Sequence, residues 1–204
     1  MRIAVFDYGA GNLHSLAKAL RGEGRAVRLE ADPRAATDAD LLVLPGVGAF
    51  GRAAAALKPG LASMRAALRD GLPCLGVCLG MQLLFEASEE GAGEGLGVLA
   101  GPVTRLRTPR RPQIGWNTVD DATDGMFARA GLTTAYYANG FACRPADPAV
   151  VIAWSTHDGD RFPAAVRAGR TLGVQFHPEK SSRPGLAFVH DFLASLAAPG
   201  APGS

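Results

Sequence analysis

A cysteine flanked by glycines follows a short apolar run near the middle of the chain. The pentapeptide G-V-C-L-G (76–80) overlaps the end of the run at 74–77 and precedes helical spacing at 81–86. A sharp strand-to-helix turn is crowded, and glycines beside it let neighbouring backbone pass close by. A helix start stabilises negative charge and so favours thiolate over thiol. We therefore expect Cys78 to be a nucleophile on an elbow, with the Leu79 N–H available to an oxyanion.

A thiolate nucleophile needs a base, and the base needs an acceptor that orients it. Of the four histidines, His177 alone ends an apolar run, at 171–176, so it should project from the carboxyl end of a sheet. Glu179 follows across Pro178, whose fixed φ keeps the chain extended. The pentapeptide alone is equally compatible with a buried structural cysteine. The His-Pro-Glu segment favours a triad of Cys78, His177 and Glu179.

A glycine-rich segment, P-G-V-G-A-F-G (45–51), follows the apolar run at 41–44. Backbone N–H groups of Gly46, Val47 and Gly48 can supply a second oxyanion donor toward the elbow. A phosphate cradle is the alternative. The sequence evidence for phosphate binding is weak, because the segment lacks the Lys-Ser/Thr of a P-loop and the full dinucleotide fingerprint.

The three cysteines, Cys74, Cys78 and Cys143, form no disulfide framework, so reduced thiols are expected. A zinc site made from Cys74, Cys78 and His177 is the alternative to the triad. Its C-x₃-C spacing falls within a strand and its turn, and no fourth ligand is evident. We expect Cys74 to be a core residue, and we expect no metal and no cofactor.

The first half of the chain alternates strand and helix signals, a pattern typical of a parallel sheet covered on both faces. The continuous apolar run at 41–44 should lie inside that sheet. The predicted elements are strands at 2–6, 26–29, 41–44 and 74–77 and helices at 13–20, 52–57, 61–69 and 81–86.

The second half has shorter strand-like pieces with more turns, which favours antiparallel or mixed pairing. These strands are predicted at 98–106, 116–119, 133–137, 150–154, 164–167 and 171–176, before a helix at 185–196. The fold class is therefore α/β, with a central mixed, mainly parallel sheet flanked by helices. We expect one domain over 1–197 and a disordered Pro/Gly/Ala tail at 198–204.

Composition agrees with one globular domain, because 204 residues with 48% hydrophobic and 20% charged side chains can bury a core. A net charge of +2 gives no electrostatic argument for nucleic acid. The longest nearly apolar run, 73–85, is too short to span a bilayer, so no membrane contact is expected. Asp7 interrupts what would be the core of a signal peptide, so the expected location is cytoplasmic.

Five segments in this chain resemble the class I (triad-type) glutamine amidotransferases, in the family's order and over nearly the whole length. The elbow and the His-Pro-Glu segment specify the class, and the other three resemble the glutaminase subunits of imidazole glycerol phosphate synthases. The segments are D-Y-G-A-G-N-L (7–13), L-P-G-V-G-A-F (44–50), L-G-V-C-L-G-M-Q-L-L-F (75–85), I-G-W-N (114–117) and G-V-Q-F-H-P-E-K-S (173–181).

The resemblance implies a role for each matching residue. Cys78 attacks the side-chain amide of glutamine, His177 relays protons, and Glu179 orients the imidazole. Ammonia leaves, and water then releases glutamate from a thioester. Gln82 would help to hold glutamine, and 45–48 would complete the oxyanion hole.

The resemblance also implies a partner. In the family, ammonia passes through a protected channel into a cyclase subunit with a (β/α)₈ barrel, and the two subunits form a heterodimer. The cyclase makes imidazole glycerol phosphate and an aminoimidazole carboxamide ribonucleotide in histidine biosynthesis. Segments that resemble those around Asn12, Trp116 and Lys180 face the partner. The alternatives are a glutaminase of pyridoxal phosphate synthesis and, from another class, a redox-sensing or chaperone-like protein without catalysis.

Two positions depart from the family pattern. Gln113 stands where many relatives carry histidine before the I/M-G-W-N segment. Residues 136–141 read Y-Y-A-N-G-F where many relatives have Y-F-x-H-S-Y. That segment lines the family's glutamine pocket, so its contacts are not carried over to this chain.

Four arginines, at positions 105, 107, 110 and 111, form a basic cluster. A solvated surface turn around Pro109 and Pro112 is the favoured interpretation. The alternative is a rim that contacts the cyclase or its phosphorylated substrate.

Overall fold

The computed structural model describes residues 1–9 and 13–197. The strands are Arg2–Phe6 (β1), Ala26–Glu30 (β2), Leu41–Leu44 (β3), Cys74–Val77 (β4), Ala87–Ser88 (β5), Pro102–Arg105 (β6), Gln113–Thr118 (β7), Thr134–Asn139 (β8), Phe141–Cys143 (β9), Val151–His157 (β10), Asp160–Ala168 (β11) and Thr171–Val174 (β12). The α-helices are His14–Leu20 (α1), Phe50–Leu57 (α2), Leu61–Arg69 (α3), Leu79–Gln82 (α4), Gly125–Ala130 (α5) and Ser182–Ala197 (α6). Short 3-10 turns are Ala35–Thr37 (η1), Lys58–Gly60 (η2), Pro148–Val150 (η3) and Pro178–Lys180 (η4).

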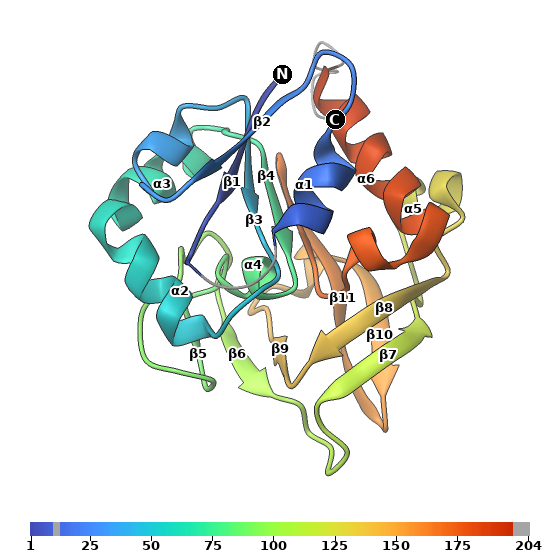
Figure 1. The fold of residues 1–204 in the computed structure, drawn as a ribbon. Coiled ribbons are helices and arrows are strands. Elements are labelled where there is room, and N and C mark those ends of the chain that lie inside the picture. Colours follow the sequence, from blue (N-terminus) through green and yellow to red (C-terminus); the bar gives the residue numbers. More distant parts are fainter. Residues whose placement is uncertain (10–12, 198–204) are drawn as a thin grey trace.

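A seven-stranded sheet forms the centre, in the order β10-β11-β12-β4-β3-β1-β2. The five strands from β12 to β2 pair in parallel, whereas β10, β11 and β12 pair antiparallel. Helices α2 and α3 cover one face, and α1, α5 and α6 lie on the other (Figure 1). The predicted α/β class with a mixed, mainly parallel sheet is confirmed.

Alternation of side chains along β3 explains why both faces are covered. Leu41 and Val43 enter the core cluster beneath α1 and α6, whereas Leu42 and Leu44 enter the cluster beneath α2 and α3. Successive strand residues point to opposite faces, so a continuous apolar run needs a hydrophobic layer on each side. The predicted interior place of this strand agrees with the observed sheet order.

The helix after the elbow differs from the prediction. It covers Leu79–Gln82 rather than 81–86, because the carbonyls of residues 83–85 accept hydrogen bonds from the backbone of 96–99. The same contacts hold 96–99 out of the strand predicted at 98–106, of which only Pro102–Arg105 forms.

The prediction omitted β5, β9 and α5. Helix α5 had detectable signals: the Asp124 carboxylate accepts from the Met126 N–H at its start, and Gly131 ends it in the left-handed region with φ +64°.

Two other sequence predictions, Asn12 as a partner-facing residue and the disordered tail at 198–204, lie outside the described residues. In the described part of the chain, no helix has the length and apolar content needed to cross a membrane.

The sheet order brings the predicted chemical residues to one edge. Strands β12, β4 and β3 are neighbours, and Val174 pairs with Val77 in register. The segments that follow these parallel strands therefore leave the sheet side by side. They are 175–177, the elbow at Cys78, and 45–48. Strands β7, β8 and β9 lie beyond this edge (Figure 1).

Candidate active site

The elbow holds Cys78 in a conformation that side chains rarely adopt. Its φ is +47° and its ψ is −103°. The Cys78 N–H donates to the Val174 carbonyl at 2.7 Å, which ties the turn to β12. Residues are held in such strained regions where the surrounding structure fixes them, and these positions cluster at functional sites.

The two flanking glycines are required by close packing. A Cβ on Gly76 would lie 2.7 Å from the Gly80 carbonyl oxygen, and a Cβ on Gly80 would lie 1.9 Å from the Leu44 carbonyl oxygen. Both distances are too short for carbon and oxygen. The pentapeptide thus provides the close backbone approach that its sequence pattern predicts.

The structure brings Cys78, His177 and Glu179 together. His177 Nδ1 lies 2.8 Å from Glu179 Oε1, and the imidazole lies close enough to Cys78 to interact with it electrostatically. Burial lowers the pKa of His177, but the interactions with Cys78 and Glu179 outweigh it and raise that pKa well above its usual range. This shift favours the protonated form of the His177 imidazole.

Strand β8 and the turn η4 fix the backbone around His177. The His177 N–H donates to the Tyr136 carbonyl at 2.8 Å. The Ser181 hydroxyl donates to the His177 carbonyl at 2.7 Å and accepts from the Tyr136 N–H at 2.9 Å. The main chain of His177 is thus held from two separate elements, as a preorganised site requires.

A small pocket of about 80 Å³ opens beside Cys78. Of the four predicted oxyanion residues, Gly46, Gly48 and Leu79 line it, whereas Val47 packs against the hydrophobic core. A Cβ on Gly46 would lie 2.9 Å from His177 Cε1 and 3.0 Å from Cys78 Cβ, so only glycine fits this close to the triad. Gln82, which the family resemblance suggests as a glutamine-binding residue, also lines the pocket.

Sequence reasoning missed one charged residue in this pocket. Glu90 lines it, and Glu90 Oε2 accepts the Phe50 N–H at the start of α2 at 2.9 Å. This places a carboxylate within reach of a bound molecule. Glu90 sits in an irregular segment between β5 and β6, and no local pattern there distinguishes it from its neighbour Glu89. The remaining lining comes from 138–141.

The two described residues predicted to face a partner lie near Tyr136. Trp116 on β7 is 55% exposed, and its ring meets that of Tyr136 edge to face at 6.3 Å. Lys180 Nζ lies 5.7 Å from the centre of the same ring. The Tyr136 carbonyl also accepts the His177 N–H. Tyr136 therefore links the exposed side chains of Trp116 and Lys180 to the triad.

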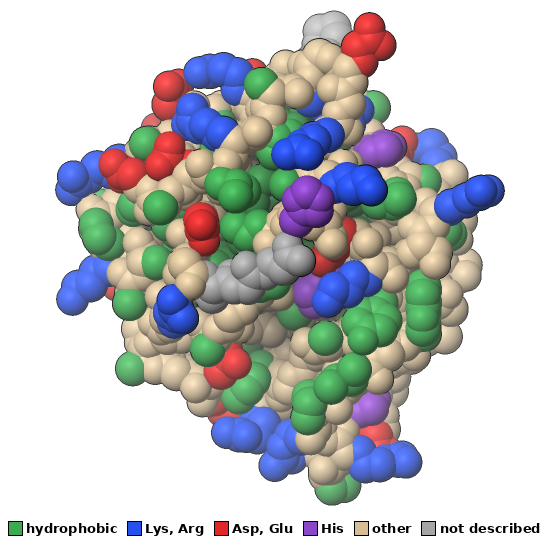
Figure 2. All heavy atoms as spheres, in the orientation of Figure 1, with side chains coloured by type: hydrophobic (Ala, Val, Ile, Leu, Met, Phe, Trp, Pro, Cys, Tyr) green, Lys and Arg blue, Asp and Glu red, His purple; other side chains and the backbone are tan. Residues whose placement is uncertain are grey.

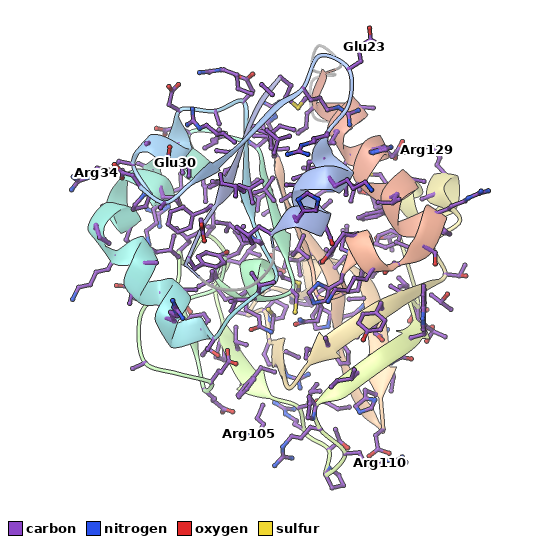
Figure 3. The ribbon with its side chains drawn as sticks, in the orientation of Figure 1. Glu23, Glu30, Arg34, Arg105, Arg110 and Arg129 are labelled. Carbon is purple, nitrogen blue, oxygen red and sulfur yellow. The ribbon has the colours of Figure 1, made fainter. Side chains whose placement is uncertain are left out.

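The arginine cluster begins at Arg105, the last residue of β6, and continues along the segment that joins β6 to β7, where Figures 2 and 3 show basic side chains at the lower edge of the view. Arg105 stacks over the Phe141 ring at 5.1 Å. Arg110 pairs with Asp158 and holds the pKa of that carboxyl well below its usual range. Arg111 donates to the Thr108 carbonyl. These contacts within the protein agree with the surface-turn interpretation.

No group of three His, Cys, Asp or Glu side chains in the described ranges, 1–9 and 13–197, could hold a metal ion. Cys74 lies in the core beneath α2 and α3, and burial raises the pKa of its thiol. The arrangement around Cys78 is compatible with acyl transfer: a cysteine, an imidazole bonded to a carboxylate, and the residues Gly46, Gly48 and Leu79 lie beside one pocket.

Comparison with known proteins agrees with this chemistry. A family model described as glutamine amidotransferase class-I matches residues 4–196. The imidazole glycerol phosphate synthase subunit HisH of Thermus thermophilus is 43% identical, over 93% of this chain and 95% of its own length. The protein of the same name from Symbiobacterium thermophilum is 46% identical, over 92% and 91%.

A solved structure described as a glutamine amidotransferase has the same fold. Its TM-score is 0.73 at 22% identity, and the match covers 97% of this chain and 99% of that one. The family model and the relatives together span nearly the whole chain. The chain therefore belongs to the class I glutamine amidotransferases.

Proposed function

We propose that this chain is the glutaminase subunit of an imidazole glycerol phosphate synthase. It hydrolyses glutamine to glutamate and ammonia and delivers the ammonia to a cyclase subunit. The contact that carries the proposal is the pairing of His177 with both Cys78 and Glu179 at the elbow. The names of the relatives from two organisms support the choice of synthase over a glutaminase of pyridoxal phosphate synthesis.

The first half of the reaction is acylation. The Cys78 thiolate attacks the side-chain amide carbon of glutamine, and the amide oxygen takes the negative charge. The Leu79 N–H and the backbone of 46–48 stabilise that charge. His177 gives its proton to the nitrogen, the C–N bond breaks, and ammonia leaves a glutamyl thioester on sulfur. Glu179 holds the imidazole in position throughout.

The second half is hydrolysis of the thioester. His177, now neutral, takes a proton from water as the water oxygen attacks the thioester carbon. The tetrahedral intermediate collapses, the C–S bond breaks, and its electron pair returns to Cys78. The new γ-carboxylic acid releases the second water proton to solvent, glutamate leaves, and the thiolate is again paired with a protonated His177.

The exposed group around Tyr136 supports a partner on this side of the molecule. Trp116 is a large aromatic side chain that is half exposed, and aromatic residues are enriched at the centres of interfaces. We assign Trp116 and Lys180 to the cyclase interface. Contact there would reach the Tyr136 carbonyl and thereby the His177 backbone. This arrangement offers a route by which the partner adjusts the triad.

Glutaminase activity should therefore depend on the complex. We expect glutamate release by this chain to rise by about tenfold or more when a (β/α)₈ cyclase subunit and its substrate are added, which corresponds to at least about 1.4 kcal/mol of transition-state stabilisation. Trp116→Ala should reduce this activation and leave the free chain unchanged. The measurement is glutamate release against cyclase concentration.

Leu29→Ala is the matched control, because Leu29 is also 55% exposed but lies on β2 at the far edge of the sheet. Activation should survive it. Full activity of the isolated chain, or equal activation of the Trp116 variant, would contradict the coupled-subunit proposal.

Glu90 gives a test of substrate recognition. Glutamine carries an α-ammonium group, and a carboxylate in the pocket can bind it with a charge-assisted hydrogen bond. Glu90→Gln keeps an acceptor for the Phe50 N–H but removes the charge. We expect kcat/KM for glutamine to fall roughly 10–100-fold, since such bonds contribute about 1.5–3 kcal/mol.

The neighbouring Glu89→Gln serves as control, because Glu89 binds the Arg105 backbone outside the pocket. A substrate that lacks the α-ammonium group should be hydrolysed equally by wild type and Glu90→Gln. An equal loss with both substrates would show that Glu90 acts only on structure.

A further inference from the structure

Gln175 lies against the sulfur of Cys78, and the proposed mechanism does not use it. Gln175 follows β12, and its side chain is completely buried. Its Nε2 lies 3.5 Å from Cys78 Sγ, within the range of a hydrogen bond to sulfur. Its backbone N–H donates to the Ala164 carbonyl at 2.9 Å, so the residue is anchored to β11.

The neighbouring groups fix which end of the Gln175 amide faces sulfur. Gln82 Nε2 lies 3.3 Å from the Phe141 carbonyl oxygen, which can only accept. The same Nε2 lies 3.3 Å from Gln175 Oε1. The Phe141 carbonyl thus orients Gln82, and Gln82 orients Gln175. With its oxygen turned to Gln82, Gln175 must present N–H to Cys78.

We propose that Gln175 is a further catalytic residue, which donates a hydrogen bond to the Cys78 sulfur whenever that sulfur carries negative charge. The proposal rests on the proposed glutaminase function and deepens it. It adds a second donor to the thiolate, on a different side chain from His177. A buried amide donor is suited to this role because it remains neutral and cannot take the proton itself.

The two halves of the reaction use this bond differently. In acylation, charge leaves sulfur for the amide oxygen, so the bond stabilises the starting thiolate. In hydrolysis, the C–S bond breaks and charge returns to sulfur, so the bond stabilises the leaving group as the transition state forms. Loss of the donor should therefore slow hydrolysis of the thioester and make the glutamyl enzyme accumulate.

The test is the pH profile of Cys78 alkylation by iodoacetamide, which needs neither glutamine nor a partner. Cys74 and Cys143 are fully buried, whereas Cys78 is 6% exposed and lines the pocket, so modification reports Cys78, and Cys78→Ala supplies the blank. In Gln175→Met we expect the midpoint of the profile to move up by about one pH unit, the shift for loss of one hydrogen bond to a charged group.

Three further variants separate loss of the donor at Gln175 from general effects on the fold. Gln175→Glu keeps the shape but places carboxyl oxygens near both sulfur and Gln82, so its upward shift should be larger. It also covers the case in which Gln175→Met does not fold. Gln113→Met is the matched control, because Gln113 is also buried and its amide has no hydrogen-bond partner within residues 1–9 and 13–197. Its profile should match wild type. Gln175→Asn is too short to reach sulfur and should behave as Gln175→Met.

Acid quenching during glutamine turnover, followed by mass measurement of the intact protein, should show more glutamyl enzyme in Gln175→Met than in wild type. An alkylation midpoint that matches wild type in all folded Gln175 variants would overturn the proposal. Absence of glutamine turnover in wild type would instead refute the proposed function, and the alkylation profiles would still decide the role of Gln175.

Discussion

Replacing Cys78 by alanine should reduce glutamine hydrolysis by roughly 10⁴-fold or more, both for the isolated chain and for its complex with a cyclase. Loss of a nucleophile that acts together with its base typically has an effect of this size or larger. Of the three cysteines in the described ranges, Cys78 is the one that interacts with His177, so no other thiol can replace it. Glutamate release under saturating glutamine is the measurement.

Cys74→Ala provides the comparison for this result. Cys74 lies in the same strand–elbow segment, four residues earlier, but its side chain packs in the core beneath α2 and α3. We expect it to lower thermal stability and to leave turnover per folded molecule near wild type. Glutamate release that survives Cys78→Ala would exclude the thioester mechanism, and a redox or binding role for the elbow cysteine would then become the better explanation.

Much of the site could be predicted because it is built from strand ends. Cys78 and His177 each follow an apolar run, and parallel neighbours in a sheet end at the same edge. The strand pairs β12–β4 and β4–β3 bring these ends together with the glycines at 46–48. The predicted catalytic residues therefore lie at one edge of the sheet, and each follows a strand that its local sequence pattern indicates.

The rest depends on contacts that no local pattern encodes. Glu90 reaches the pocket from a loop by binding the start of α2, 40 residues earlier in the chain. The orientation of the Gln175 amide is fixed by a hydrogen bond from Gln82, which lies 93 residues away in the sequence. The helix after Cys78 stops at Gln82 because the backbone of 96–99 donates to the carbonyls of 83–85. Such long-range hydrogen bonds override helix propensity over a few residues.

The elbow itself should be sensitive to a single methyl group at Gly80. In Gly80→Ala the new Cβ would lie 1.9 Å from the Leu44 carbonyl oxygen and 2.5 Å from its carbonyl carbon. Strand β3 cannot move aside, because it is hydrogen-bonded to β1 on one side and to β4 on the other. We expect a loss of more than about 3 kcal/mol in the free energy of unfolding, above the usual cost of overpacking.

For a chain of this length that loss corresponds to a fall in Tm of roughly 6–12 °C, measurable by thermal denaturation. Gly140→Ala is the matched control, since Gly140 faces the same pocket but a Cβ there would meet only Pro112, at 3.8 Å. A Gly80 variant as stable as the Gly140 variant would mean that β3 and the elbow can separate. The close approach of the two backbones would then not be what holds Cys78 in its strained conformation beside His177.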